Sequence, residues 1–167
     1  MLETERDPHA LAVVIDAFTS YCRSGKGAVR VHADHPDPHV RRTVASNPFI
    51  DPAEHPEVVA APMRLAADPV PSTRATALHK FTLSRVDTPE LRAVLAARLA
   101  DPHLDARIEA AAGLALRGDA RGSAVLGEIR SGIEHVRSPG AARLHDIRRL
   151  LEDRQAREDR AGAADRG

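Results

Sequence analysis

Residues 101–107 read DPHLDAR and lead into an alanine-rich apolar run that ends at Leu116. Aspartate is a favoured helix N-cap and proline is favoured at the first helical position, so this stretch predicts the start of a helix. The same pair recurs along the chain, at Asp7-Pro8, Asp37-Pro38, Asp68-Pro69 and Asp101-Pro102, at intervals of 30, 31 and 33 residues. A helix start that returns at nearly constant spacing is typical of an α-solenoid, in which stacked helical hairpins share one core.

Apolar residues follow each of these Asp-Pro pairs at the spacing of a buried helix face. The stripes are formed by Leu11, Val14, Ile15 and Phe18; by Val40, Val44 and Ala45; by Ala75, Leu78, Phe81 and Thr82; and by Leu104, Ile108, Ala111, Ala112 and Ala115. Partner helices are predicted from Pro52 or Glu54 to Ala67, from Thr88-Pro89 onward, and from Ala120 to Ile133. Residues 28–33 form either a brief helix or an irregular return.

The predicted fold is therefore all-α: a right-handed α-solenoid of about four helical-hairpin repeats, followed by a C-terminal helix from Ala141 to about Arg154. We expect one domain over residues 1–154, with repeats that begin near residues 7, 37, 68 and 101. Residues 155–167 have no apolar stripe and are predicted to be a disordered or frayed tail.

Composition narrows the function classes. The chain has 167 residues, equal numbers of basic and acidic side chains (24 each), and a formal net charge of zero, so whole-chain electrostatics does not favour a polyanionic partner. Cys22 is the only cysteine, which excludes an internal disulfide and fits a reducing compartment. The N-terminal residues lack the apolar core of a signal peptide, and no run reaches the roughly 18 apolar residues of a membrane span. A cytoplasmic protein without a membrane segment is expected.

The fourth repeat resembles the bacterial HEAT-like repeats, also called phycobilisome-lyase-type repeats. The resemblance is carried by Asp101, Arg107, Ala110–Ala112, Gly118-Asp119 and Ala124–Leu126. Residues 40–48, VRRTVASNP, instead resemble a leucine-rich repeat variant, a related all-helical repeat. Together the two patterns cover about residues 37–132, and residues 7–36 match less well. The resemblance implies a helical repeat architecture, which serves many functions.

The resemblance also implies a structural role for an Asp/Arg ladder, formed by Asp68 with Arg74 and by Asp101 with Arg107. In HEAT-like repeats the aspartate caps the helix. The arginine six residues later reaches back to it or to the aspartate of the neighbouring repeat, since adjacent helices lie only about 8–10 Å apart. The second repeat departs from this pattern, because Asp37 and Arg42 are separated by one residue fewer.

Histidines offer the most conspicuous candidate for metal binding. His32, His35 and His39 cluster with two aspartates in the segment 32–39, HADHPDPH, and imidazoles with carboxylates can ligate zinc. The segment is interrupted by proline, however, and histidine follows Asp-Pro in three repeats, which is explained by repetition alone. No metal or other cofactor is therefore predicted, and the three histidines remain weak candidates.

Catalytic groups are hard to assemble from this sequence. Cys22 is expected to be a small residue near a helix end, and the loop 24–27, SGKG, lacks the full phosphate-loop pattern. The favoured hypothesis is a non-catalytic scaffold that binds a protein or peptide partner through the concave face of the solenoid. The residues predicted on that face are Arg41, Arg42, Arg74, His79 and Lys80.

Two alternatives stay open at this point. HEAT-like repeats include chromophore lyases and DNA glycosylases, so an enzyme or enzyme accessory is one alternative. The other is a nucleic-acid binder, in which the arginines of the first helices would follow phosphates along the concave face. The near absence of aromatic residues, 2% with no Trp, removes the usual stacking platform for bases. Val13 lies outside the main apolar stripe and leaves homodimerisation open.

Overall fold

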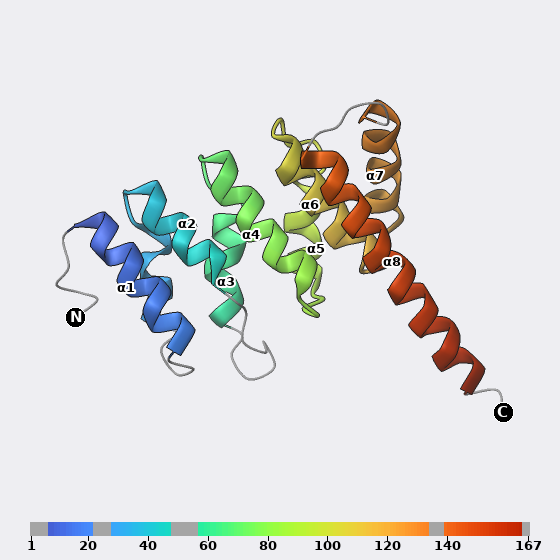
Figure 1. Ribbon diagram of the computed structural model, residues 1–167, viewed down its shortest axis with the longest axis horizontal. Coiled ribbons are helices and arrows are strands. Elements are labelled where there is room, and N and C mark those ends of the chain that lie inside the picture. Colours follow the sequence, from blue (N-terminus) through green and yellow to red (C-terminus); the bar gives the residue numbers. More distant parts are fainter. Residues whose placement is uncertain (1–6, 22–27, 48–56, 134–138, 165–167) are drawn as a thin grey trace. The chain divides into compact units, whose positions relative to one another are not determined.

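The structure is a computed structural model that describes residues 7–21, 28–47, 57–133 and 139–164 (Figure 1). Every described element is a helix, and no strand occurs among these residues. The elements are α1 (Pro8–Tyr21), the 3₁₀ helix η2 (Ala28–Asp34), α2 (Pro38–Ser46), α3 (Glu57–Leu65), α4 (Pro71–Leu83), α5 (Pro89–Ala96), α6 (Leu104–Ala115), α7 (Ala120–Ile133) and α8 (Pro139–Ala164). The all-α prediction is confirmed for the described part of the chain.

The chain divides into two compact units, Met1–Val94 and Leu95–Gly167. The boundary falls inside α5, in the middle of the region for which the sequence predicts one domain over residues 1–154. Each unit has its own buried residues.

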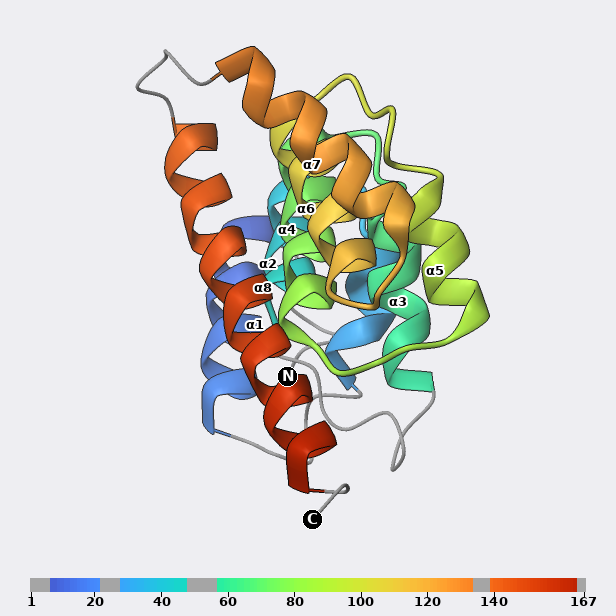
Figure 2. The same ribbon diagram turned by 90° about the vertical axis from the view of Figure 1, so that its right-hand side faces the viewer.

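Unit 1 is built from two layers of helices. α1, α2 and α4 lie side by side in one layer, and η2 and α3 pack beneath them (Figures 1 and 2). The core between the layers is formed by large apolar side chains with almost no exposed surface, among them Ile15, Val40, Leu65, Leu78 and Phe81. Burial of such side chains stabilises a fold by about 1.5–3 kcal/mol each. This core therefore holds α1, α2 and α4 in place, with their outer sides facing away from η2 and α3.

Local signals start α2 and α5 as the sequence predicts, whereas α4 has Val70 and not Asp68 as its N-cap. Asp37 is the N-cap of α2, and its carboxylate accepts a hydrogen bond of 2.7 Å from the backbone N–H of His39. Asn47 ends the same helix. The Thr88 hydroxyl accepts from the backbone N–H of Leu91 at 3.2 Å, which caps α5. Pro62 lies inside α3, where the sequence predicts a kink or a split.

Unit 2 is centred on α6, which packs against both α7 and α8. Its core contains Ile108, Ala111 and Ala112 of α6, Ile129 of α7 and Ile147 of α8, all buried. Close packing of α6 and α7 depends on Gly122. A Cβ atom there would lie 2.3 Å from the Ala111 carbonyl oxygen and 2.5 Å from the Ala115 backbone nitrogen.

Gly118 ends α6 with a backbone conformation that favours glycine. Its φ is +73°, the left-handed region in which a Cβ atom is strained. The Gly118 N–H donates to the Ala115 carbonyl at 3.0 Å, and the Asp119 N–H donates to the Leu114 carbonyl at 3.0 Å. These two hydrogen bonds form a Schellman motif, which turns the chain into α7.

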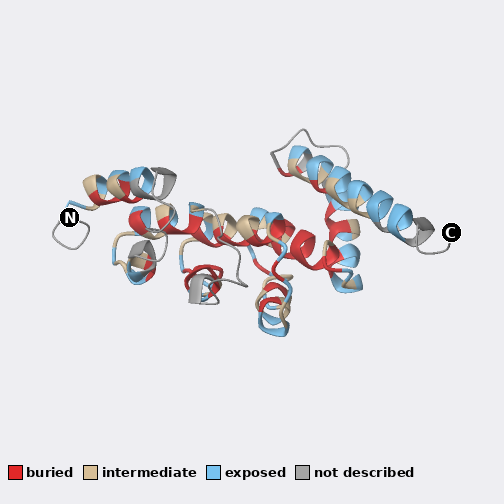
Figure 3. Cartoon of the chain, turned by 90° about the horizontal axis from the view of Figure 1, so that it is seen from below, coloured by how far each residue is buried: buried red, intermediate tan, exposed pale blue. Residues whose placement is uncertain are grey.

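α8 runs from Pro139 to Ala164 and is longer than the helix that the sequence predicts, because it continues through residues 155–164. Its described side chains beyond Arg154 are exposed (Figure 3). This exposure agrees with the missing apolar stripe of the segment that the sequence predicts as a frayed tail. None of the described helices is both long enough and apolar enough to cross a membrane.

Candidate binding face

The repeat has a constant register of 33 residues in the structure. α2, α4 and α6 begin at Pro38, Pro71 and Leu104. The Asp-Pro pairs do not share this register. Asp37 caps α2 directly, whereas Asp68 and Asp101 lie three residues before the first residues of α4 and α6. The Asp-Pro spacing therefore mixes two different structural roles.

The true counterpart of Asp68-Pro69 and Asp101-Pro102 in the second repeat is His35-Pro36. The Asp68 carboxylate accepts from the Val70 N–H at 2.8 Å, and the Asp101 carboxylate accepts from the His103 N–H at 2.9 Å. Nδ1 of His35 accepts from the Asp37 N–H at 3.1 Å in the same way. An imidazole nitrogen thus takes the place of a carboxylate oxygen at this position.

Arg41, Arg74 and Arg107 occupy one position in this register, six residues after His35, Asp68 and Asp101. Each guanidinium returns to the turn before its own helix. Arg41 donates to the His35 and Pro36 carbonyls at 2.9 Å, Arg74 donates to the Asp68 carbonyl at 2.8 Å, and Arg107 donates to the Asp101 carbonyl at 3.0 Å. These bonds satisfy backbone oxygens that a turn leaves without partners.

The carboxylate of Asp68 is held by the preceding repeat. Arg41 donates to both of its oxygens, from Nε at 2.6 Å and from Nη2 at 3.1 Å. The two side chains are 12% and 3% exposed, so this is a buried bidentate ion pair. The hydrogen bond to Asp68 raises the pKa of the Arg41 guanidinium.

This contact changes the roles predicted from the sequence. The bonds described for Arg74 and Arg107 go to the backbone carbonyls of Asp68 and Asp101, and the Asp68 carboxylate pairs with Arg41 of the neighbouring repeat. Arg41 and Arg74, predicted as exposed residues of a binding face, are largely buried in the scaffold. The Asp-Pro spacing aligns Arg42 with Asp37 and therefore does not reveal the role of Arg41.

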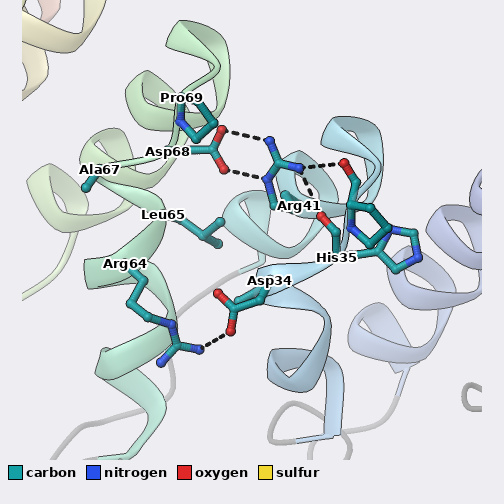
Figure 4. Close-up of a pocket in the computed structure, with 10 residues that line it drawn as sticks. Asp34, His35, Arg41, Arg64, Leu65, Ala67, Asp68 and Pro69 are labelled. Atoms are coloured by element: carbon teal, nitrogen blue, oxygen red, sulfur yellow. Dashed lines mark hydrogen bonds and ion pairs between the residues drawn. The ribbon is translucent and has the colours of Figure 1, made fainter.

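A pocket of about 330 Å³ opens beside this ion pair, between η2, the start of α2, and the end of α3 (Figure 4). Asp34, His35, Arg41, Arg64 and Asp68 supply its polar lining. Arg64 and Asp34 face each other across it at 3.3 Å, with side chains that are 54% and 73% exposed. Such exposed pairs contribute little stability, so Arg64 is the cation of this pocket that an incoming group can engage most readily.

The remaining predicted residues lie on the exposed sides of the first-layer helices. We call this surface the open face of unit 1. Its residues are His9, Val13 and Asp16 on α1, His39, Arg42 and Ser46 on α2, and Thr76, His79, Lys80 and Leu83 on α4. Val13 and Leu83 are each 57% exposed, which is high for large aliphatic side chains. Arg42 is exposed, and His79 and Lys80 are half-buried.

The corresponding side of α6 is covered by α8. In the 33-residue register, Ala112 takes the place of His79 and has no exposed surface. Glu109 takes the place of Thr76, is 5% exposed, and accepts hydrogen bonds from Nε and Nη2 of Arg143, the latter at 2.9 Å. The bond to Glu109 raises the pKa of Arg143.

The predicted histidine cluster does not assemble as a metal site. Among the described residues, no three His, Cys, Asp or Glu side chains lie close enough together to hold an ion. His32 and His35 have ring centroids 6.4 Å apart, and His39 instead stacks on His9, with centroids 5.7 Å apart. The proline-interrupted backbone turns His39 into the next helix, away from its neighbours in sequence. Cys22 lies outside the described residues.

Comparison of the chain with protein-family models, with curated proteins and with solved structures finds no match in any of the three.

Proposed function

We propose that this chain is a non-catalytic HEAT-like α-solenoid module that acts in the cytoplasm and binds another protein through the open face of unit 1. The observation that carries the proposal is the pairing of two features in unit 1. α1, α2 and α4 lie side by side, and their exposed sides combine aliphatic, hydroxyl and cationic side chains. Protein-binding surfaces combine such apolar contacts with a polar surround.

The repeat register supports the solenoid part of the proposal. Three helices begin 33 residues apart, and an arginine at one position of each repeat binds the turn before its helix. Stacked repeats need such equivalent contacts because no single hairpin buries both of its faces. The nucleic-acid alternative loses support, because Arg41 and Arg74 are engaged in the scaffold and are removed from the set of cations able to follow phosphates.

Site-specific photo-crosslinking tests the proposal in cells. A benzophenone amino acid placed at His79 or Ser46 reports on the open face, and the same group at Glu128, an exposed position of α7, serves as the matched control. We expect one protein to crosslink from both open-face positions and not from Glu128. Absence of a crosslinked protein at the open face, or identical products from all three positions, would contradict the proposal.

A further inference from the structure

Two cations of the open face lack a counter-charge within the described part of the chain. Arg42 and Lys80 make no ion pair or hydrogen bond with any residue that the structure describes. The other arginine of α2 contrasts with them, because Arg41 is paired with Asp68. An unpaired cation on a surface is available to a carboxylate without first breaking an existing bond, so Arg42 and Lys80 are positions where an acidic partner gains attraction.

Exposed aliphatic side chains share this face with the cations. Val13 and Leu83 are each 57% exposed. A phosphate backbone gains nothing from covering a valine or a leucine, whereas a protein segment that buries both gains about 25 cal/mol for each Å² of apolar surface removed from water. The combination of cationic and aliphatic groups therefore favours an acidic, amphipathic protein segment over a nucleic acid.

Unit 2 contains an example of a helix that packs on the side of α6 equivalent to the open face of α4. α8 lies against α6 with a charged contact, Arg143 to Glu109, and with an apolar contact from Ile147, four residues further along. Residues four apart lie on one side of a helix, so a single helix face makes both contacts. At the position of Glu109 the open face has the neutral Thr76, and its cations, Arg42 and Lys80, lie at other positions of the register. A helix bound there would supply the acid, because the scaffold supplies the cations.

We infer that the open face of unit 1 binds an acidic amphipathic helix of a partner protein, in which a Glu or Asp is followed four residues later by an aliphatic residue. The carboxylate pairs with Arg42 or Lys80, and the aliphatic residue covers Val13 or Leu83. This inference rests on the proposed function and adds the chemistry of the partner.

The test is a selection of 16-residue peptides from a random displayed library on the full chain, followed by affinity measurement of the enriched peptides. We expect enriched sequences to carry Glu or Asp four residues before Leu, Ile or Val. Combining Arg42→Glu with Lys80→Glu should weaken their binding about tenfold or more, as expected when two surface attractions become repulsions. Arg130→Glu, at an exposed α7 position, is the matched control and should leave binding unchanged.

Other outcomes distinguish the acidic-helix inference from the proposed function. Enriched neutral or basic peptides that lose binding on His79→Trp would overturn the acidic-helix inference and leave the proposed function standing. Peptides that bind independently of every open-face variant, or no enrichment at all, would overturn both. Binding of a labelled single-stranded oligonucleotide that is lost with the Arg42 and Lys80 variants, and is tighter than that of any peptide, would replace the partner class. Thermal melts of the Arg42 and Lys80 variants should match that of the unmodified chain, because these side chains make no hydrogen bond or ion pair with a described residue.

Discussion

α4 and α6 begin 33 residues apart and bind the turns before them through equivalent arginines, but their surroundings differ. α4 is buried on one side and presents Thr76 and His79 at or near the surface, whereas α6 is buried almost all round, with Glu109 and Ala112 beneath α8. The difference shows that two helices with the same start signal can have opposite roles. The repeat sequence does not determine whether the outer side of its first helix is exposed. That depends on whether another helix, such as α8, packs on it.

The largest effect is expected where α6 is packed most closely. Gly122→Ala places a Cβ atom 2.3 Å from the Ala111 carbonyl oxygen, a backbone atom that cannot rotate away. Separation of α6 from α7 should lower the free energy of unfolding by about 3 kcal/mol or more, at the upper end for overpacked sites. Urea denaturation followed by circular dichroism measures the change.

Gly127→Ala is the matched control in the same helix. Apart from its chain neighbours and the backbone of its own helix, no atom of the described residues lies within 4 Å of the added Cβ, so the helical preference of alanine should raise stability by up to about 1 kcal/mol. Equal destabilisation by both variants would show that α7 does not pack on α6 as described.

The next effect concerns the link between repeats in unit 1. Arg41→Met leaves the Asp68 carboxylate buried without its counter-charge and should cost about 3 kcal/mol, the lower end for a broken buried ion pair. Arg42→Met, one residue later and without a described partner, should change stability by no more than about 0.5 kcal/mol. Comparable losses in the two variants, measured by urea denaturation, would contradict the assignment of Arg41 to the scaffold.

The equivalent variant in unit 2 should have a smaller effect. Arg143→Met removes the partner of Glu109, but the Arg143 side chain is 23% exposed and water can reach part of the pair. We expect a loss of about 2 kcal/mol, reduced from the value for a fully buried pair. Adding Glu109→Gln should restore part of the loss, because the buried charge is then gone. A double variant less stable than Arg143→Met would contradict this account of the pair.

A gain in stability is expected inside α4. The Thr73 side chain has no exposed surface, and its hydroxyl has no hydrogen-bond partner among the described residues, whereas the equivalent position of α6 is Ala106. Thr73→Val keeps the shape and removes the unsatisfied hydroxyl, which should raise the free energy of unfolding by about 1 kcal/mol. A rise in melting temperature confirms it, and a fall would indicate that the hydroxyl has a partner after all.

Helix positions were predictable from local patterns, while the register and the covering helix were not. α7 begins and ends at the predicted residues, Ala120 and Ile133, because capping and apolar spacing are local signals. The Asp-Pro pair was a poorer guide. Asp51-Pro52 is a further copy that falls off the interval and lies outside the described residues. The interval of six residues from the residue before proline to an arginine marks the register better, and it includes His35 with Arg41.

Contacts between distant residues had no comparable signal. Glu109 is a single charge within an alanine-rich run, which hints at a buried partner, but nothing local indicates that the partner is Arg143, 34 residues away. The placement of α8 on α6 depends on how Ile147 and its neighbours fill the surface of α6 and α7. Sequence spacing therefore gave no indication that α6 is covered by α8.

Cysteine labelling tests the contrast between the open and covered faces most directly. In a Cys22→Ser background, His79→Cys and Ala112→Cys place one thiol at the same register position of α4 and of α6. We expect a thiol reagent to modify position 79 at nearly the rate of an unfolded control and position 112 at least about a hundredfold more slowly, because reaction there requires α8 to detach at a cost of about 3 kcal/mol or more. Equal rates at the two positions in the folded chain would contradict the account.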